Sequence, residues 1–407
     1  MNERQRAKSA PVLCGECDLL AKSQRTGLAG EIFDHWCQGL PAPKPDGSNG
    51  TYPGAWLGFL PVKSENCPKE HEMTMTTEAA TMPQAARCEI FNEDCITGMA
   101  KRIPDESVHL SITSIPFEEL FTYSGKLEDV GNNGSTIDIT AGRFALNMRF
   151  VVAQLLRVTA PGCNVVIHIQ QLLAYKNQHG YQGRRDFRGA MIDVFSAGGF
   201  QFIGEVAIPK DPQQMAQRLN LHSLQFKTGY ARSATSWAMA PNDYCLIFQK
   251  PGEVAVPVRP LAHRENPGGW ITTEDWIKWA SGVWPDILQM DVLDGWRSAR
   301  ESEEEKHVCP LQLSLIYRFA QIYTNPISIQ PDVTILDPFM GIGSTAYVAL
   351  GGECHDGALL EPRNVIGFEL KESYFDQATR NITKLRKLQA EEYQREQAAL
   401  LFPEEED

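Results

Sequence analysis

The stretch VTILDPFMGIGSTAYVAL, residues 333–350, decides the fold. It consists of an apolar run that ends at Asp337, a turn that contains Gly341 and Gly343, and a second apolar run with helical spacing. A strand, a glycine-rich turn and a helix in this order bind ligands in open α/β sheets. Glycine has no Cβ, so the backbone can turn tightly and approach a ligand, and the helix start offers unpaired N–H groups. This stretch therefore predicts a binding site at the carboxyl end of a buried strand.

A second carboxylate follows the next predicted strand. The run NVIGFE, residues 364–369, ends in Glu369, which is placed to accept both hydroxyl groups of a ribose. The bound molecule is therefore expected to be a nucleoside. GIGSTA also satisfies the G-x-G-x-x-A fingerprint of dinucleotide-binding folds, so a nicotinamide-dependent oxidoreductase is one alternative. S-adenosylmethionine fits better, because the glycines do not follow the strand directly, little chain remains after Gly343, and Asp337 can balance its ammonium group.

Seven short apolar runs predict the strands of one sheet. They are CEIF near 88, SVHLSIT near 107, NVVIHI at 164–169, FIGEVAI at 202–208, DYCLIFQ at 243–249, VTILD at 333–337 and NVIGFE at 364–369. Most are continuous rather than alternating, as strands covered on both faces require. The segment from Phe144 to Leu155 has the spacing of a covering helix, which we expect to end at Pro161-Gly162. The predicted fold class is α/β, with a doubly wound, mostly parallel sheet.

At these residues the chain resembles the amino-group DNA methyltransferases of the permuted (beta) order. DPFMGIGST at 337–345 is similar to their D-P-F-x-G-x-G-[ST], GFELKESYFDQATRNI at 367–382 to their G-x-E-x-x-x-x-Y-x-x-x-A-x-x-R-[IL], and TSIPF at 113–117 to their T-S-P-P-[FYW]. KHVCPLQLSLIYRF at 306–319 resembles the segment that opens their cofactor helix, and EIFNEDCITGM at 89–99 resembles their edge strand and following acid. The resemblance runs from about 88 to 382 and is nearest to phage and prophage members. It implies a Rossmann-like sheet with an inserted DNA-recognition segment.

The resemblance implies S-adenosylmethionine-dependent methyl transfer to adenine N6 or cytosine N4 of double-stranded DNA. The catalytic candidates are Ser114, Ile115, Pro116 and Phe117. The Ser114 side chain and the Ile115 carbonyl could accept the two N–H groups of the base, and Phe117 could stack on the flipped base. Ile115 stands where the family has a proline, so the rigidity of proline is lost, and a DNA-binding relative without turnover is a second alternative. Serine at 114 is more frequent among cytosine-N4 enzymes and does not exclude adenine.

The resemblance also implies a set of cofactor contacts. The candidates are Asp94, His307, Asp337, Phe339, Gly341, Gly343 and Glu369. Asp94 could bind the cofactor's adenine amine or, equally, cap the helix that begins at Ile96-Thr97. His307 could contact the methionine part of the cofactor or make no contact with it. Pro310 is expected to be a first-turn proline of the helix that carries Leu311 and Leu315.

The charge distribution bears on the DNA partner. The net charge of −13 argues against a nucleic-acid ligand, but residues 171–235 carry eight basic and four acidic side chains, a local balance of +4. The predicted phosphate contacts are Arg184, Arg185, Arg188, Arg218 and Lys227. Ordinary solvated side chains are the alternative. The loop 122–140 is expected to close over the base, and the tryptophans of the segment 251–306 could pack on the sheet, face the substrate, or do both.

Composition divides the chain into five expected parts. They are an N-terminal appendage at 1–85, a catalytic half at 86–250, a Trp-rich recognition segment at 251–306, a cofactor-binding half at 307–390 and an acidic tail at 391–407. In the appendage Cys14, Cys17, Cys37 and Cys67 could hold one zinc ion, or be free thiols in a loosely structured segment. We find no apolar run of membrane-spanning length and no export signal, so we expect a cytoplasmic protein without a membrane partner.

Overall fold

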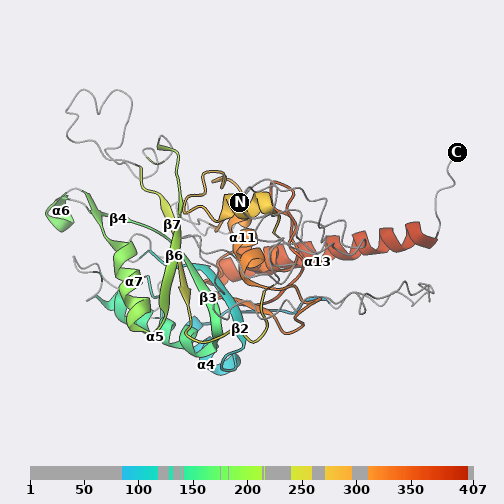
Figure 1. Ribbon diagram of the computed structural model, residues 1–407, viewed down its shortest axis with the longest axis horizontal. Helices are drawn as coiled ribbons and strands as arrows, with labels where there is room; N and C mark the ends of the chain where they lie inside the picture. The colour runs from blue at the N-terminus through green and yellow to red at the C-terminus, as the bar shows by residue number, and fades with distance from the viewer. Residues whose placement is uncertain are drawn as a thin grey trace, which may run out of the picture. The chain divides into compact units, whose positions relative to one another are not determined.

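Seven strands form one sheet in the computed structural model (Figure 1). They are β1 (Cys88–Phe91), β2 (Val108–Ser114), β3 (Thr159–Gln170), β6 (Gln201–Ile208), β7 (Asp243–Gln249), β8 (Thr334–Asp337) and β9 (Asn364–Phe368). Their spatial order is β1-β9-β8-β2-β3-β7-β6. The first five are parallel, whereas β7 runs antiparallel to β3 and β6 antiparallel to β7. The predicted mostly parallel, seven-stranded α/β sheet is thus confirmed.

The structure describes ten stretches of the chain. They are 85–117, 128–131, 139, 142–174, 176–181, 183–212, 215, 240–258, 271–295 and 310–401. All of them belong to one unit, Met82–Asp407. The four candidate zinc ligands Cys14, Cys17, Cys37 and Cys67 lie outside the described residues, as do His307, Arg218 and Lys227.

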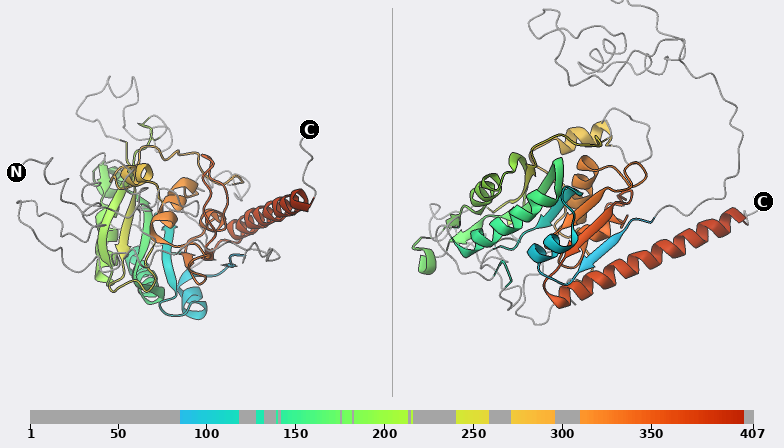
Figure 2. Two further views of the ribbon diagram at one scale, coloured as in Figure 1. Left: turned by 45° about the vertical axis from the view of Figure 1, so that its right-hand side comes forward. Right: turned by 90° about the horizontal axis from the view of Figure 1, so that it is seen from below.

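Helices cover both faces of the sheet (Figure 2). One hydrophobic cluster joins it to α11 (Leu313–Tyr323), α12 (Ser344–Ala349) and α13 (Glu372–Leu401), and the other joins it to α4 (Cys95–Arg102), α5 (Arg143–Val158) and α7 (Phe187–Ala197). In β3 the side chain of Val166 belongs to the first cluster and those of Val165 and Ile167 to the second. Successive residues of a strand point to opposite faces, so a continuous apolar run supplies both layers.

The predicted end of the helix from Phe144 is wrong. Helix α5 ends at Val158, and β3 begins at Thr159, so Pro161-Gly162 lies within the strand rather than after the helix. The pairing of β2 with β3 shifts register between Val108 and Leu110, and such an irregularity accommodates a proline that cannot donate to the ladder. Helix α13 buries Ala378 and Leu385, whereas Leu388 is 50% exposed. Beyond that residue α13 runs into solvent (Figure 2).

Short elements complete the described part. They are an antiparallel hairpin of β4 (Leu172–Ala174) and β5 (Gly183–Arg185), the helical turn α6 (Lys176–His179), and α10 (Thr273–Trp279). The hairpin is absent from the sequence-based prediction.

Two tryptophans of the Trp-rich segment pack against α11. Trp284 is buried against Phe319, with ring centroids 4.9 Å apart, and its indole N–H donates to the Trp279 carbonyl. The guanidinium of Arg318 lies 5.2 Å from the Trp284 ring centroid and pairs with Asp286. The packing interpretation therefore holds for Trp279 and Trp284.

The two glycines of the turn after β8 have different surroundings. Both have positive φ, +57° at Gly341 and +91° at Gly343. A Cβ at Gly341 would meet no atom within 4 Å, whereas one at Gly343 would lie 3.1 Å from Cβ of Ala378 on α13. Only Gly341 thus leaves open space for a ligand, and Gly343 allows α12 and α13 to pack closely.

We expect Gly343→Ala to lower the free energy of unfolding by about 2–4 kcal/mol, from left-handed strain and overpacking against α13. Gly357→Ala is the matched control, because Gly357 has a φ of +82° but its nearest non-neighbouring atom to an added Cβ is 3.8 Å away. It should lose only about 1 kcal/mol. Urea unfolding of both variants measures the difference, and equal losses would contradict the assigned packing role.

Candidate active site

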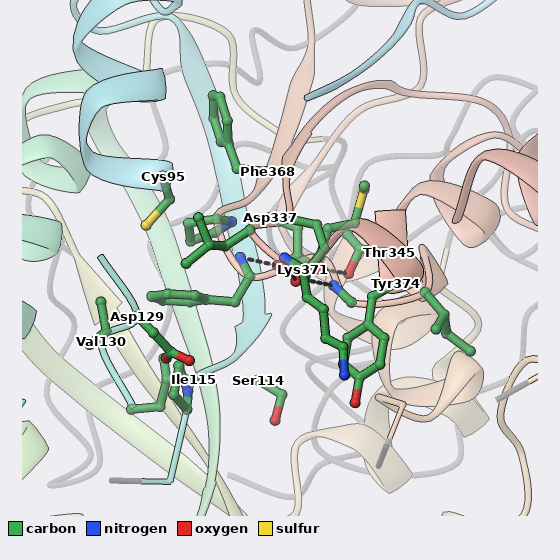
Figure 3. A pocket seen from close by; sticks show the side chains of 18 of the residues that line it. Cys95, Ser114, Ile115, Asp129, Val130, Asp337, Thr345, Phe368, Lys371 and Tyr374 are labelled. Atoms are coloured by element: carbon green, nitrogen blue, oxygen red, sulfur yellow. Dashed lines mark hydrogen bonds between the residues drawn. The ribbon is translucent and has the colours of Figure 1, made fainter. Parts of the chain in front are cut away.

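A pocket lies at the carboxyl ends of β1, β2, β8 and β9 (Figure 3). Its lining residues are 93–95, 114–117, 128–130, 310–311, 337–342, 344–345, 368–371 and 374. The lining includes all four catalytic candidates and, of the cofactor candidates, Asp94, Asp337, Phe339, Gly341 and Glu369. The structure therefore brings together motifs that lie far apart in the chain. Part of the loop predicted to close over the base, residues 128–130, also lines the pocket.

Asp337 ends β8 and is buried beneath the glycine-rich turn. Its Oδ1 accepts the backbone N–H of Phe339 at 3.1 Å, and its Oδ2 accepts the Thr345 hydroxyl at 2.6 Å. Burial raises the pKa of this carboxyl to about 6, although both hydrogen bonds oppose the shift. Asp337 thus holds the glycine-rich turn in place through these two hydrogen bonds and also lines the pocket. The sequence did not indicate this structural role.

Glu369 joins the glycine-rich turn to the loop after β9. Its Oε2 accepts the backbone N–H of Gly341 and its Oε1 that of Lys371, both at 2.8 Å. Burial raises the pKa of the carboxyl to about 7, and the two N–H groups oppose the shift. Each carboxylate oxygen retains a further acceptor position, so the side chain can also bind ligand hydroxyl groups.

The pocket lining as a whole is acidic. Among the described lining residues there are six carboxyl side chains and one lysine. Asp94 accepts the Thr97 backbone N–H at 2.8 Å and its hydroxyl at 2.9 Å, so the capping role is confirmed, while its adenine contact stays a prediction. Lys371 stacks over the Tyr374 ring at 4.6 Å, and Figure 3 shows both polar ends on one side of the pocket. This electrostatic environment favours a cationic ligand.

The thiol of Cys95 also lines the pocket. The residue begins α4, and its side chain is buried beside the Asp94 carboxyl. Burial raises the pKa of this thiol well above its usual value, and the charge of Asp94 raises it further. Cys95 is therefore neutral at physiological pH.

The sequence Ser114-Ile115-Pro116-Phe117 forms one wall of the pocket. Ile115 is 2% exposed, and its side chain belongs to the hydrophobic cluster beneath α4 and α5. The position usually taken by proline is thus held by packing instead of by a ring. Phe117 meets Phe187 edge to face at a centroid distance of 6.3 Å.

Ser114 has a partner that the sequence motifs do not indicate. The Ser114 hydroxyl lies 3.0 Å from Nδ1 of His168, its register partner on β3. The only sequence signal is a histidine inside the otherwise apolar run NVVIHI. A side-chain pair across neighbouring strands depends on register, which the run alone does not provide.

Several predicted contacts lie away from the pocket or have internal partners. Arg185 is 7% exposed, so its side chain is not placed along a phosphate backbone in this conformation. Arg188 pairs with Glu205 at 2.5 Å. Helix α11 begins at Leu313 with Gln312 as its N-cap, so the first-turn assignment of Pro310 is wrong.

Among the described residues, no group of three or more His, Cys, Asp or Glu side chains could hold a metal ion. No helix in this part of the chain is long and apolar enough to cross a membrane.

Known proteins resemble this chain in sequence and in fold. A stretch of 148 residues, 36% of the chain, is 28% identical to the type II methyltransferase M.BglI of Bacillus subtilis, and it spans only 32% of that relative's length. TTHA0409 of Thermus thermophilus, solved with S-adenosyl-L-methionine, is 19% identical at a TM-score of 0.48, covering 74% of this chain and 94% of that one. The cytosine-N4-specific PvuII DNA methyltransferase is 17% identical at a TM-score of 0.47, with coverages of 73% and 86%.

A family model described as DNA methylase matches residues 108–380, which include the SIPF wall, the glycine-rich turn and the Glu369 loop. This match extends over more than half of the chain, and it confirms the resemblance to amino-group DNA methyltransferases. The chain belongs to the N6/N4 DNA methylase family.

Proposed function

We propose that this protein transfers the methyl group of S-adenosylmethionine to an exocyclic amino group, cytosine N4 or adenine N6, of double-stranded DNA. The observation that carries the proposal is one acidic pocket that joins the SIPF wall to the glycine-rich turn and Glu369. The permuted beta order and a phage or prophage origin belong to this proposal, and they rest on the resemblance of the motifs and their order. A cytoplasmic location in a bacterial host is a further part of it.

The pocket residues fit this cofactor. Ser344 Oγ is buried in the lining and has no hydrogen-bond partner among the described residues, so it is available to a polar ligand. The open space above Gly341 allows close approach to the backbone. Asp337 and Glu369 supply negative charge for a cation and acceptors for hydroxyl groups. When bound, S-adenosylmethionine supplies an activated methyl group on a sulfonium.

Residues of the Ser114–Phe117 wall act on the base. The amino nitrogen of adenine or cytosine is a poor nucleophile, because its lone pair is delocalised into the ring. Ser114 and the Ile115 carbonyl accept its two N–H groups and favour a tetrahedral nitrogen, whose lone pair is then localised. Phe117 stacks on the flipped base and fixes its orientation. Positioning and fixed dipoles of this kind lower the activation free energy of methyl transfer by roughly several kcal/mol.

The function is tested by incubating the protein with tritiated S-adenosylmethionine and genomic DNA from a strain without DNA methylases. We expect label in the DNA, and long-read sequencing should locate N4-methylcytosine or N6-methyladenine in one sequence context. DNA without label, together with preferential binding of NADH, would support an oxidoreductase instead. Cofactor and DNA binding without label would support the non-catalytic relative.

We expect Phe117→Ala to lower the rate of methyl transfer about 100-fold, since the base loses its stacking surface, while the Kd for S-adenosylmethionine changes less than threefold. Phe150→Ala is the matched control, because Phe150 is 54% exposed on α5 and outside the pocket lining. Single-turnover kinetics and calorimetry give the two quantities. Equal losses in rate and in cofactor affinity would contradict the assignment of Phe117 to the base.

Cofactor affinity should fall as the pH is lowered from about 7 to about 5. The pKa values of Asp337, about 6, and Glu369, about 7, are raised by burial, so both carboxyls take up protons in this window. A cationic ligand binds the ionised forms. Protonation of each carboxylate that binding requires therefore weakens the affinity by up to about tenfold per pH unit below the pKa of that carboxyl. Calorimetry across this range measures the slope, and Glu369→Gln should bind weakly with a flatter profile. An affinity independent of pH would refute this electrostatic role.

We propose that the DNA backbone lies along Arg184 of β5 and the basic residues that follow it in the sequence, with the Trp-rich segment as a second surface. Alanine substitution of Arg184, Arg218 and Lys227 together should flatten the dependence of log affinity on log salt by roughly 0.9 per lost phosphate contact. Arg185→Ala, at a buried side chain, should leave that slope unchanged. Fluorescence anisotropy at several salt concentrations measures this slope. An unchanged slope in the triple variant would indicate that the DNA follows another path.

A further inference from the structure

Ser114 is the pocket end of a chain of polar side chains that runs across three neighbouring strands. Its hydroxyl lies 3.0 Å from His168 Nδ1, and His168 Nε2 lies 2.9 Å from Oδ2 of Asp243 on β7. The ammonium of Lys210, which follows β6, lies 2.5 Å from the same Oδ2. Gln170 donates to the other oxygen, Oδ1, at 2.9 Å. The Asp243 carboxylate therefore has fixed partners on both oxygens.

The partners of His168 determine which ring nitrogen carries the proton. The Lys210 ammonium, 2.5 Å from Oδ2, favours the ionised form of the Asp243 carboxyl. An ionised carboxylate only accepts, so His168 Nε2 must donate to it. In the neutral ring Nδ1 is then an acceptor, and the Ser114 hydroxyl donates to Nδ1. The lone pairs of Ser114 Oγ are consequently available to a donor in the pocket.

We propose that His168 is a positioning residue for methyl transfer, which holds the Ser114 hydroxyl as an acceptor and takes up, through it, the proton that the amino group loses. This inference rests on the proposed function. It adds to that function a route for the proton, made by Ser114 together with His168 on β3 and Asp243 on β7, two side chains outside the motifs that carry the family resemblance.

The transfer balances in atoms and electrons. The bond between sulfur and the methyl carbon breaks, its electron pair stays on sulfur, and the nitrogen lone pair forms the new N–C bond. The nitrogen then carries the positive charge and loses a proton to Ser114 Oγ, while the Oγ–H proton moves to His168 Nδ1. The N–H electron pair returns to nitrogen, and the charge is now on an imidazolium beside the Asp243 carboxylate. The His168 side chain is 11% exposed, and it releases the proton to solvent afterwards.

The titratable groups that face His168 among the described residues are Asp243 and Cys245 on β7 and Lys210 after β6. Burial raises the pKa of the Cys245 thiol well above its usual value, so that thiol stays neutral and does not compete for the proton.

The test compares His168→Asn with wild type at saturating S-adenosylmethionine, on genomic DNA from a methylase-free strain. Asparagine retains a polar group near Nδ1 but cannot take up a proton. We expect the single-turnover rate to fall about 100-fold or more, while the Kd for S-adenosylmethionine stays within threefold. His109→Asn is the matched control, because His109 accepts the Thr334 N–H at 3.1 Å in the same sheet, outside the pocket lining. It should retain the wild-type rate.

A double-mutant cycle decides whether His168 acts through Ser114. If it does, His168→Asn in a Ser114→Ala background should cause no further loss of rate. If His168→Asn fails to fold, Asp243→Asn replaces it in the same measurements, since an amide no longer requires a proton on Nε2. A rate within threefold of wild type in His168→Asn, losses that add in the cycle, or an equal loss in His109→Asn would each overturn the inference. An inactive wild-type protein would instead refute the proposed function.

Discussion

The parallel pairing of β2 with β8 is the constraint on which the site depends. Ser111 donates its hydroxyl to the Leu336 carbonyl at 3.1 Å across 225 residues of sequence, and Leu336 is followed by Asp337, which lines the pocket. The chain leaves β8 through α12 toward β9, and it leaves β2 through α5 toward β3, so the two connections diverge. Ligands of open α/β sheets bind where such connections diverge. The site is thus a consequence of strand order, and the side chains only specify what it binds.

Burial of ionised carboxylates in this crevice is unfavourable, and neighbouring backbone groups offset part of the desolvation free energy. Asp337 and Glu369 are desolvated carboxyls, and their raised pKa values show that the ionised forms are disfavoured without a ligand. Backbone N–H groups of the glycine-rich turn and of the loop after β9 offset part of that cost. The same bonds fix the shape of the turn. Electrostatic preparation for a cation and the rigidity of the binding loop therefore arise from the same hydrogen bonds.

The sequence predicted those features that depend on neighbouring residues. Continuous apolar runs locate all seven strands, and local motifs identify Asp337 and Glu369 without any knowledge of strand order. Features that depend on register or on tertiary burial were missed. The contact between Ser114 and His168 requires the pairing of β2 with β3, and the burial of Arg185 requires the β4–β5 hairpin, whose strands have three residues each. Helix ends were misplaced at Pro161-Gly162 and Pro310, because proline is compatible with either side of a boundary.

The thiol of Cys95 in the pocket wall has a consequence for the chemical selectivity of the site. A thiolate is a far stronger nucleophile than a base amine, so an ionised cysteine beside an activated methyl group would compete with the substrate and alkylate the protein itself. The thiol, not the thiolate, is present here, because burial and the neighbouring Asp94 charge disfavour ionisation. The acidic, desolvated environment that attracts a cation thus also protects the protein from self-inactivation. For the same reason, this cysteine should be a poor target for covalent inhibitors.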